Sequence, residues 1–282
     1  RRASGYRLRV SGDFDKLNRN LLPLYLKHRI ATSSLAAGAA LVRNFGRTLA
    51  VRSHPELSLL KAEDTLIETV LSKLIKPGNQ CLDIGAHIGS MSYSLGQKAG
   101  FENVKIVEAI PEKAKWLKER FGEEQVYEFA ITTSVGEVEF YQNLKRPGFS
   151  SLSERGKKEE IKVIKVECAS LDDLFGNILV DFIKIDVEGH EYDALKSGTN
   201  LLEHCKPIIL FEAGAIKDVR NDRYDELFEF LTVDLKYEIF AVFELFHRNR
   251  PITINEFRLY RTYPFLAFNF VAITPETRSK MR

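Results

Sequence analysis

The segment Cys81–Gly89, which reads Cys-Leu-Asp-Ile-Gly-Ala-His-Ile-Gly, constrains the fold of this chain more than any other. An apolar run ends at Asp83, glycines follow at Gly85 and Gly89, and an amphipathic stretch runs from Ser90 to Ala99. Glycine lets a ligand approach the backbone closely, and a helix that begins beside it presents free N–H groups. The segment therefore predicts a strand, a tight turn and a helix that together bind a nucleotide-like ligand.

An acidic residue in the next apolar run indicates that this ligand contains a nucleoside. The run Val104–Ile110 carries Glu108 near its end. A carboxylate at that position can accept hydrogen bonds from both hydroxyls of a ribose, as the acidic residue of dinucleotide-binding folds does. The glycine turn and the acid together predict an adenosine-type ligand.

The spacing of the turn discriminates between adenosine ligands. The chain has no Gly-Lys-Ser/Thr, which argues against a P-loop, and Gly85–Gly89 does not give the G-x-G-x-x-G spacing of nicotinamide and flavin folds. The turn fits instead the D-x-G-x-G-x-G pattern of class I S-adenosylmethionine methyltransferases, with His87 at the middle glycine. We expect positive φ at His87, which histidine tolerates better than most residues. Asp83 is expected near the ammonium or sulfonium of the cofactor; alternatively it is a turn or capping residue.

At these positions and in two further segments the chain resembles the FkbM-type methyltransferases. The resemblance rests on Leu82–Gly89, Val107–Glu112, Ser170–Phe175 and, most specifically, Val180–Glu191, and extends from Glu63 to Thr274. The family usually has Asn where this chain has His87. The resemblance implies an S-adenosyl-L-methionine-dependent O-methyltransferase that acts on hydroxyls of sugars, glycans or polyketide-type natural products.

Strand and helix patterns alternate from Leu57 onward, which favours right-handed crossovers and a doubly wound sheet. We predict an α/β fold with a mostly parallel seven-stranded sheet of the class I methyltransferase, Rossmann-like type. The expected strands of the sheet are 80–84, 104–109, 126–130, 180–185, 207–211, 237–243 and an antiparallel 265–274. A further strand with strict alternation is expected over 161–168. A hairpin over 131–141 is inserted. Residues 1–56 form a basic, mainly helical extension, and residues 57–282 form the cofactor-binding domain.

The carboxyl ends of parallel strands meet at one edge of such a sheet, and ligands bind there. The predicted strand ends carry Asp83, Glu108, Ala130, Asp186 and Glu212, which are therefore expected around one crevice. The full set of expected cofactor-binding residues is Asp83, Gly85, Ala86, His87, Gly89, Glu108, Ala109, Ala130 and Asp186.

The segment Asp186–Glu191 holds the candidate catalytic groups. Methyl transfer to oxygen needs alignment of donor and acceptor, and a base that removes the proton of the hydroxyl. Asp186 is the first choice for this base, and Glu188 is expected to share the role or to bind the acceptor. His190 adds an imidazole that titrates near neutral pH. Gly189 is expected to supply the unusual backbone angle that turns the carboxylates inward.

Two other interpretations of these acids exist. Glu188 and Glu191 could merely complement the dipole of the following helix. Asp186, Glu188 and Glu212 also offer the oxygen ligands that Mg²⁺ prefers, but nothing in their spacing requires a metal, and none is predicted.

The acceptor pocket is expected to use two further segments. The turn Pro147–Ser151 supplies Ser150 and Ser151, and Glu212 stands at a strand end nearby. The segments 247–250, with Arg248, and 258–263 mix guanidinium and aromatic groups, which suits a polyhydroxylated or acidic acceptor. Alternatively these segments are ordinary surface or the contact of a homo-oligomer.

Composition adds bounds on location and partners. With 44% hydrophobic and 28% charged residues and apolar runs of strand length, the chain is expected to be globular, without a membrane span. Cys81, Cys168 and Cys205 lack metal-ligand spacing, so we expect free thiols and a reducing, cytoplasmic compartment. Residues 1–55 hold eleven Lys or Arg and two acids, but aromatic residues do not interleave with them, so nucleic acid is not an expected partner.

Three alternative functions remain open at this stage. A nicotinamide oxidoreductase would share the strand, the turn and the ribose acid. A catalytically inactive relative would bind the cofactor or a partner without turnover and would tolerate Asp186→Ala. An N-methyltransferase would need a pocket for an amine rather than a base.

Overall fold

The computed structural model describes residues 58–143, 151–152, 161–215, 223–247, 249–263 and 265–280. From Leu59 onward they belong to one compact unit, Leu59–Arg282. The predicted extension 1–56 and two predicted acceptor residues, Ser150 and Arg248, lie outside the described residues.

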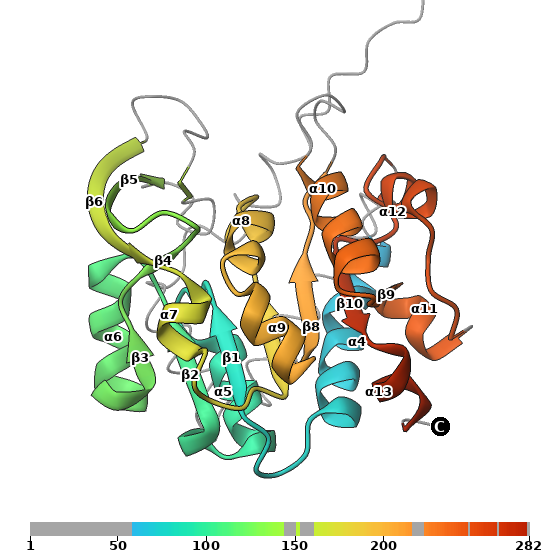
Figure 1. Ribbon diagram of the computed structural model, residues 1–282, viewed down its shortest axis with the longest axis horizontal. Helices are drawn as coiled ribbons and strands as arrows, with labels where there is room; N and C mark the ends of the chain where they lie inside the picture. The colour runs from blue at the N-terminus through green and yellow to red at the C-terminus, as the bar shows by residue number, and fades with distance from the viewer. Residues whose placement is uncertain are drawn as a thin grey trace, which may run out of the picture. The chain divides into compact units, whose positions relative to one another are not determined.

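The core of the unit is a seven-stranded sheet with the order β3-β2-β1-β7-β8-β10-β9 (Figure 1). The strands are β1 (Cys81–Ile84), β2 (Val104–Val107), β3 (Val126–Tyr127), β7 (Phe182–Ile185), β8 (Ile208–Glu212), β9 (Glu238–Ala241) and β10 (Asn269–Ile273). β10 runs antiparallel to β8 and β9, and the other described pairings in this sheet are parallel. The predicted doubly wound, mostly parallel sheet with an antiparallel last strand is confirmed.

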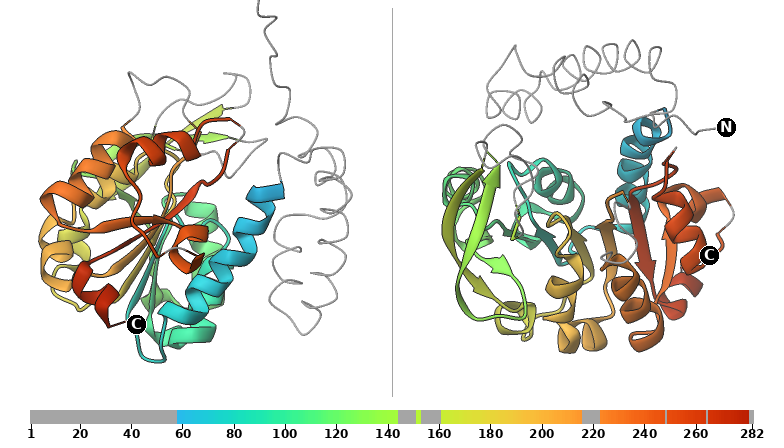
Figure 2. Two further views of the ribbon diagram at one scale, coloured as in Figure 1. Left: turned by 90° about the vertical axis from the view of Figure 1, so that its right-hand side faces the viewer. Right: turned by 90° about the horizontal axis from the view of Figure 1, so that it is seen from above.

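Helices cover both faces of this sheet (Figure 2). One hydrophobic cluster joins one face to α4 (Ser58–Leu74), α5 (Ser90–Ala99) and α6 (Pro111–Phe121). The other cluster joins the opposite face to α7 (Leu171–Phe175), α8 (Glu191–Lys196), α9 (Thr199–Cys205), α10 (Tyr224–Glu229) and α12 (Ile254–Tyr260). The remaining helices are α11 (Val242–His247), α13 (Pro275–Ser279), a π-helical turn at Phe230–Asp234 and short 3₁₀ turns at Phe101–Asn103 and Glu123–Gln125.

The inserted hairpin exists, but its arms differ from those predicted. β5 (Gly136–Asn143) pairs antiparallel with β6 (Ile161–Ala169), and β4 (Ala130–Ile131) pairs parallel with the other edge of β6. β4 and β5 are not neighbours in this three-stranded sheet, so the predicted hairpin over 131–141 is wrong in its pairing. The predicted third strand 126–130 is also divided, because Val126–Tyr127 joins the main sheet and Ala130 begins β4.

Two predicted helical regions also differ from the structure. The helix expected after Glu191 is interrupted at Gly198, where a Cβ atom would lie 2.7 Å from the Cβ of Leu171 in α7. Helices α11 and α12 between β9 and β10 were not predicted. The start of α12 nevertheless carries a signal in the sequence, since Thr253 and Glu256 form a capping box.

The described helices include none with the length and apolar character needed to span a bilayer. Cys81, Cys168 and Cys205 carry free thiols, as expected from their spacing.

Candidate active site

The turn after β1 has the backbone conformation that the sequence predicts. φ is 77° at Gly85, 56° at His87 and 85° at Gly89, so the expected positive φ at His87 is confirmed. A Cβ atom at Gly85 would lie 2.0 Å from the backbone oxygen of Asp186. Glycine is therefore required at this position, because the turn packs directly against the segment that follows β7.

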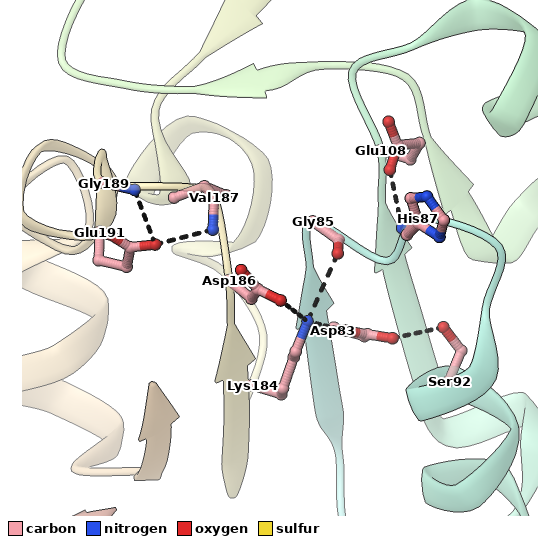
Figure 3. A network of polar contacts seen from close by, with 10 residues as sticks. All are labelled: Asp83, Gly85, His87, Ser92, Glu108, Lys184, Asp186, Val187, Gly189 and Glu191. Atoms are coloured by element: carbon pink, nitrogen blue, oxygen red, sulfur yellow. Dashed lines mark hydrogen bonds and ion pairs between the residues drawn. The ribbon is translucent and has the colours of Figure 1, made fainter. Parts of the chain in front are cut away.

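Glu108 joins this turn to the end of β2. Its Oε2 accepts a hydrogen bond from the backbone N–H of His87 at 2.8 Å (Figure 3). Its Oε1 accepts one from the backbone N–H of Ile110 at 2.9 Å. Burial raises the pKa of the Glu108 carboxyl, and the positive charge of Lys113 opposes that rise. The carboxylate is thus fixed in place, with lone pairs left over for hydroxyl donors.

A cavity of about 290 Å³ opens at the carboxyl ends of β1, β2 and β7. Eight predicted site residues line it: Gly85, His87, Glu108, Ala109, Ala130, Asp186, Glu188 and His190. The remaining described wall residues are Ile84, Val107, Ile110, Lys113, Phe129, Ile131, Phe140, Leu152 and Val187. One wall is apolar and comes partly from the inserted sheet, so the cavity combines a polar turn with a surface suited to an adenine ring.

Five other predicted residues lie outside the described lining. Ala86 and Gly89 are packed into the fold, with Gly89 against Leu117 and Phe121. Ser151 is buried, and its backbone pairs with Tyr141 at the edge of β5. Asp83 and Glu212 lie close to the cavity as parts of a charged network.

Asp83 is fully buried beneath the turn rather than exposed to a ligand. Its Oδ2 accepts a hydrogen bond from the Ser92 hydroxyl at 2.5 Å, and its Oδ1 lies 3.6 Å from the Nζ of Lys184. Burial raises the pKa of Asp83, and Lys184 and Ser92 oppose that rise. The structure thus gives Asp83 a contact with Lys184, and its place near the ammonium or sulfonium of the cofactor stays a prediction.

Lys184 is a member of this charged network that sequence reasoning missed. Its Nζ lies 3.6 Å from Asp186 Oδ2 and donates a hydrogen bond to the backbone oxygen of Gly85 at 3.4 Å. Burial alone would lower the pKa of Lys184, but the nearby carboxylates outweigh burial and raise it. The available signal was a single lysine inside the otherwise apolar segment 182–185.

Glu191 shapes the loop that carries Asp186 and Glu188. Its Oε1 accepts hydrogen bonds from the backbone N–H groups of Val187 at 2.9 Å and Gly189 at 3.2 Å. φ is 55° at Glu188 and 94° at Gly189, so the unusual angle expected at Gly189 is confirmed and extends to Glu188. Glu191 is only 1% exposed. Through these two hydrogen bonds it fixes the backbone of the loop, in addition to its position at the start of the helix.

Glu212 ends β8 within the same electrostatic environment. Burial, followed by the negative charges of Asp186 and Glu188, raises the pKa of Glu212 well above its ordinary value. This environment favours the protonated carboxyl. Among the described residues, no group of three or more His, Cys, Asp or Glu side chains is placed to hold a metal ion.

The arginines expected to bind an acidic acceptor are engaged elsewhere. Arg258 holds Asp225 through two nitrogens, at 3.0 and 2.7 Å from Oδ2, and Arg250 pairs with Glu256. Arg261 is fully buried and donates from Nε to the backbone oxygen of Gly214 at 2.9 Å. These three arginines therefore do not support the prediction that guanidinium groups bind an acidic acceptor.

The residues around the cavity fit S-adenosyl-L-methionine. The fixed Glu108 carboxylate suits the ribose hydroxyls, and Ala109, Ile110 and Ile131 provide apolar contacts for an adenine ring. The carboxylate of Asp186 lies near the glycine turn, where the positively charged methionine part is expected. No part of this fit requires a residue that the structure places away from the cavity.

Comparisons with known proteins agree with this fit. The family model for the methyltransferase FkbM domain matches residues 83–239, more than half of the chain. The chain is similar to the methyltransferase FkbM from Methylobacillus flagellatus KT, with 19% identity, a TM-score of 0.40 and coverage of 70% of this chain and 43% of that one. A S-adenosylmethionine-dependent methyltransferase from Thiobacillus denitrificans in complex with S-adenosyl-L-homocysteine shows 12% identity, a TM-score of 0.36 and coverage of 74% and 89%.

No curated protein matches the sequence. The chain spans less than half the length of the Methylobacillus flagellatus protein, and structural likenesses this distant carry no argument about individual residues. The assignment rests on the domain match and on the sheet, whose topology is the predicted class I methyltransferase one. The chain belongs to the FkbM methyltransferase domain family.

Proposed function

We propose that the chain is an O-methyltransferase that methylates a hydroxyl of a sugar, glycan or polyketide-type small molecule. The observation that carries the proposal is the placement of Asp186. Its carboxylate lines the cavity, is 31% exposed, and is paired with a buried lysine. A partly exposed carboxylate beside the expected position of the methyl donor is the kind of group that O-methylation requires as a base.

Bound S-adenosyl-L-methionine supplies an electrophilic methyl group, and the chain's residues do the rest. Glu108 holds the ribose, and the backbone of Gly85 and His87 supports the methionine part. Asp186 accepts the proton of the acceptor hydroxyl as the oxygen attacks. Glu188 and His190, which also line the cavity, orient the acceptor.

The electrostatics favour a neutral acceptor over an acidic one. Burial and then the negative charges of Asp186 and Glu188 raise the pKa of Glu212, and Asp186 and Glu188 themselves line the cavity, so an anion would be repelled there. A polyhydroxylated acceptor can instead donate hydrogen bonds to these carboxylates. We therefore propose a sugar-like or polyketide-like acceptor without a carboxylate or phosphate next to the reacting hydroxyl.

The first experiment is calorimetric titration of the chain with S-adenosyl-L-homocysteine, with NAD⁺ and NADH alongside. We expect micromolar binding of S-adenosyl-L-homocysteine and a loss of at least about tenfold in Glu108→Ala, since two ribose hydrogen bonds disappear. Tighter binding of a nicotinamide would contradict the proposal.

The second experiment tests the base with a panel of neutral and acidic hydroxylated acceptors and labelled S-adenosyl-L-methionine. Asp186→Asn should lower kcat by about 10²–10⁴-fold, while Asp234→Asn, an exposed acid paired with Lys196, should leave it unchanged. Turnover that survives Asp186→Asn would favour an amine acceptor. Cofactor binding without turnover on any acceptor would favour a catalytically inactive relative.

We also propose two properties of the whole chain. Residues 1–56 form a basic extension separate from the catalytic domain 57–282, as the concentration of Lys and Arg in that segment suggests. The free thiols of Cys81, Cys168 and Cys205 suit a reducing compartment, which favours the cytoplasm.

A further inference from the structure

Three charged side chains form a continuous row beneath and beside the cavity. The Nζ of Lys184 lies 3.6 Å from Asp83 Oδ1 on one side and 3.6 Å from Asp186 Oδ2 on the other (Figure 3). The side chains of Asp83, Lys184 and Asp186 are 0%, 12% and 31% exposed. The row therefore runs from the interior of the sheet to the wall of the cavity.

This arrangement is costly unless its charges are matched. A lysine buried among the apolar residues of β7 loses hydration, and two carboxylates brought this close repel each other. Lys184 also donates to the backbone oxygen of Gly85, so the same ammonium contacts the turn that follows β1. The Lys184 ammonium thus connects the turn after β1 with the Asp186 carboxylate that lines the cavity.

We propose that Lys184 is a positioning residue whose charge holds the Asp186 carboxylate at the cavity wall, where the ammonium of the cofactor and the acceptor hydroxyl meet it. The role of Asp186 toward the acceptor rests on the proposed function. Its role toward the cofactor does not, because an ionised carboxylate attracts the ammonium of the bound cofactor whatever the acceptor is.

The other charged groups around Asp186 make Lys184 decisive. Asp83 on β1, Glu108 after β2, Glu212 on β8, and Glu188 and Glu191 in and after the loop are acidic. Lys113 on α6 is the second cation whose charge interacts with Asp186. Without Lys184, negative charge dominates around Asp186.

The test is the affinity for S-adenosyl-L-homocysteine between pH 4 and 8, measured by calorimetry on the full chain. The ammonium of this ligand stays charged over that range, so changes in affinity report protein groups. Wild type should lose affinity as pH falls, and Asp186→Asn should remove the part of that loss that Asp186 causes.

Lys184→Gln keeps a polar side chain but removes the charge. It should shift the Asp186-dependent loss of affinity upward by about one pH unit, the effect expected of a unit charge at this distance from a partly exposed carboxylate. Lys184→Arg should restore the wild-type profile. The matched control is Lys165→Gln. Lys165 forms an ion pair with Glu137, but both side chains are solvated, so the loss of this pair should leave the affinity unchanged.

A purely structural role for Lys184 gives a different result. Affinity would then fall equally at every pH, and Lys184→Gln would have the same effect in the Asp186→Asn background; either outcome overturns the proposal. The thermal midpoint of each variant shows whether it is folded, and Lys184→Arg keeps the test valid if Lys184→Gln unfolds. Failure to find an acceptor leaves this test unaffected, because it measures cofactor affinity alone.

Discussion

Gly85 is the residue at which the turn after β1 packs against the segment that follows β7. Its φ of 77° and the 2.0 Å approach of the Asp186 oxygen to a hypothetical Cβ exclude any side chain. Gly78 has a similar φ of 89° but no atom within 4 Å of its hypothetical Cβ. The two glycines therefore form a matched pair in which only the steric contact differs.

We predict that Gly85→Ala abolishes binding of S-adenosyl-L-homocysteine and that Gly78→Ala leaves the affinity unchanged. Both substitutions carry the backbone cost of positive φ, about 1 kcal/mol in the free energy of unfolding, and Gly85→Ala adds the clash with Asp186. Urea unfolding and calorimetry measure the two effects. Equal losses of affinity in both variants would show that the contact with Asp186 is unimportant.

At this scale the sequence predicted backbone features better than side-chain partners. Positive φ at His87 and Gly189 followed from residue type and position within short motifs. The contacts of Lys184 did not, because its partners Asp83, on β1, and Gly85, in the turn that follows β1, are distant from it in sequence. The hydrogen bonds that Glu191 accepts from Val187 and Gly189 were missed because an acid at a helix start already had a local explanation.

The inserted sheet is the element that distinguishes one side of the cavity. Phe140 on β5 and Leu152 near its edge line the cavity together with Ala130 and Ile131 of β4. Phe140 also packs in a small hydrophobic cluster with Ile110, Val166 and Cys168. The insertion is therefore part of the cavity wall and not an independent appendage.

We predict that Phe140→Ala weakens S-adenosyl-L-homocysteine binding by about tenfold and lowers the free energy of unfolding by about 3 kcal/mol, since it removes a buried ring. Val163→Ala on β6, which is 51% exposed, should change both quantities little and serves as the control. Binding that is insensitive to Phe140→Ala would exclude the insertion from the cofactor site.

The elements of the main sheet were predictable because each strand carries its own pattern of apolar residues and is followed by a helix. The strand pairing within the insertion was not predictable. β5 ends at Asn143 and its partner β6 begins at Ile161, and alternation within one strand does not specify a partner so far along the chain. The short helices α11 and α12 were hidden between two strand patterns, although the Thr253–Glu256 capping box marked one of them.

For the molecule as a whole, the buried acids make stability depend on pH in an unusual direction. Burial raises the pKa of Asp83, Glu108, Glu191 and, most strongly, Glu212. In the pH range between their unfolded and folded pKa values the folded chain binds more protons than the unfolded chain. Their contribution to stability is therefore complete below the unfolded pKa and is lost as pH rises through the folded pKa.

We predict that the free energy of unfolding rises as pH falls from 7 toward about 5, above the unfolded pKa of these carboxyls. The hydrogen bond with Arg250 lowers the pKa of Glu256 to about 2, so Glu256 makes stability fall as pH falls. That effect begins only below the ordinary pKa of a glutamate, outside the range of this prediction. Glu212→Gln should flatten the rise, whereas Glu203→Gln, an exposed control, should not. Urea unfolding at several pH values measures the slope, and an identical slope in Glu212→Gln would refute the assignment.

The fold and the location of the site were predictable at the level of the whole molecule because parallel strands bring their carboxyl ends together. What could not be predicted is which strand-end residues reach the cavity: Glu108 and Asp186 do, while Asp83 is fully buried. That distinction depends on how far along its strand each residue lies and on what packs over its side chain, and only the folded structure defines both.

The described lining of the cavity has one further consequence. All of it comes from the stretch between Ile84 and His190, although the main sheet continues through β8, β10 and β9. Substitutions from Pro207 onward therefore leave the residues of that lining unchanged. They reach the cavity only through packing or charge, as the Glu212 carboxyl does through its interaction with Lys184 and Asp186.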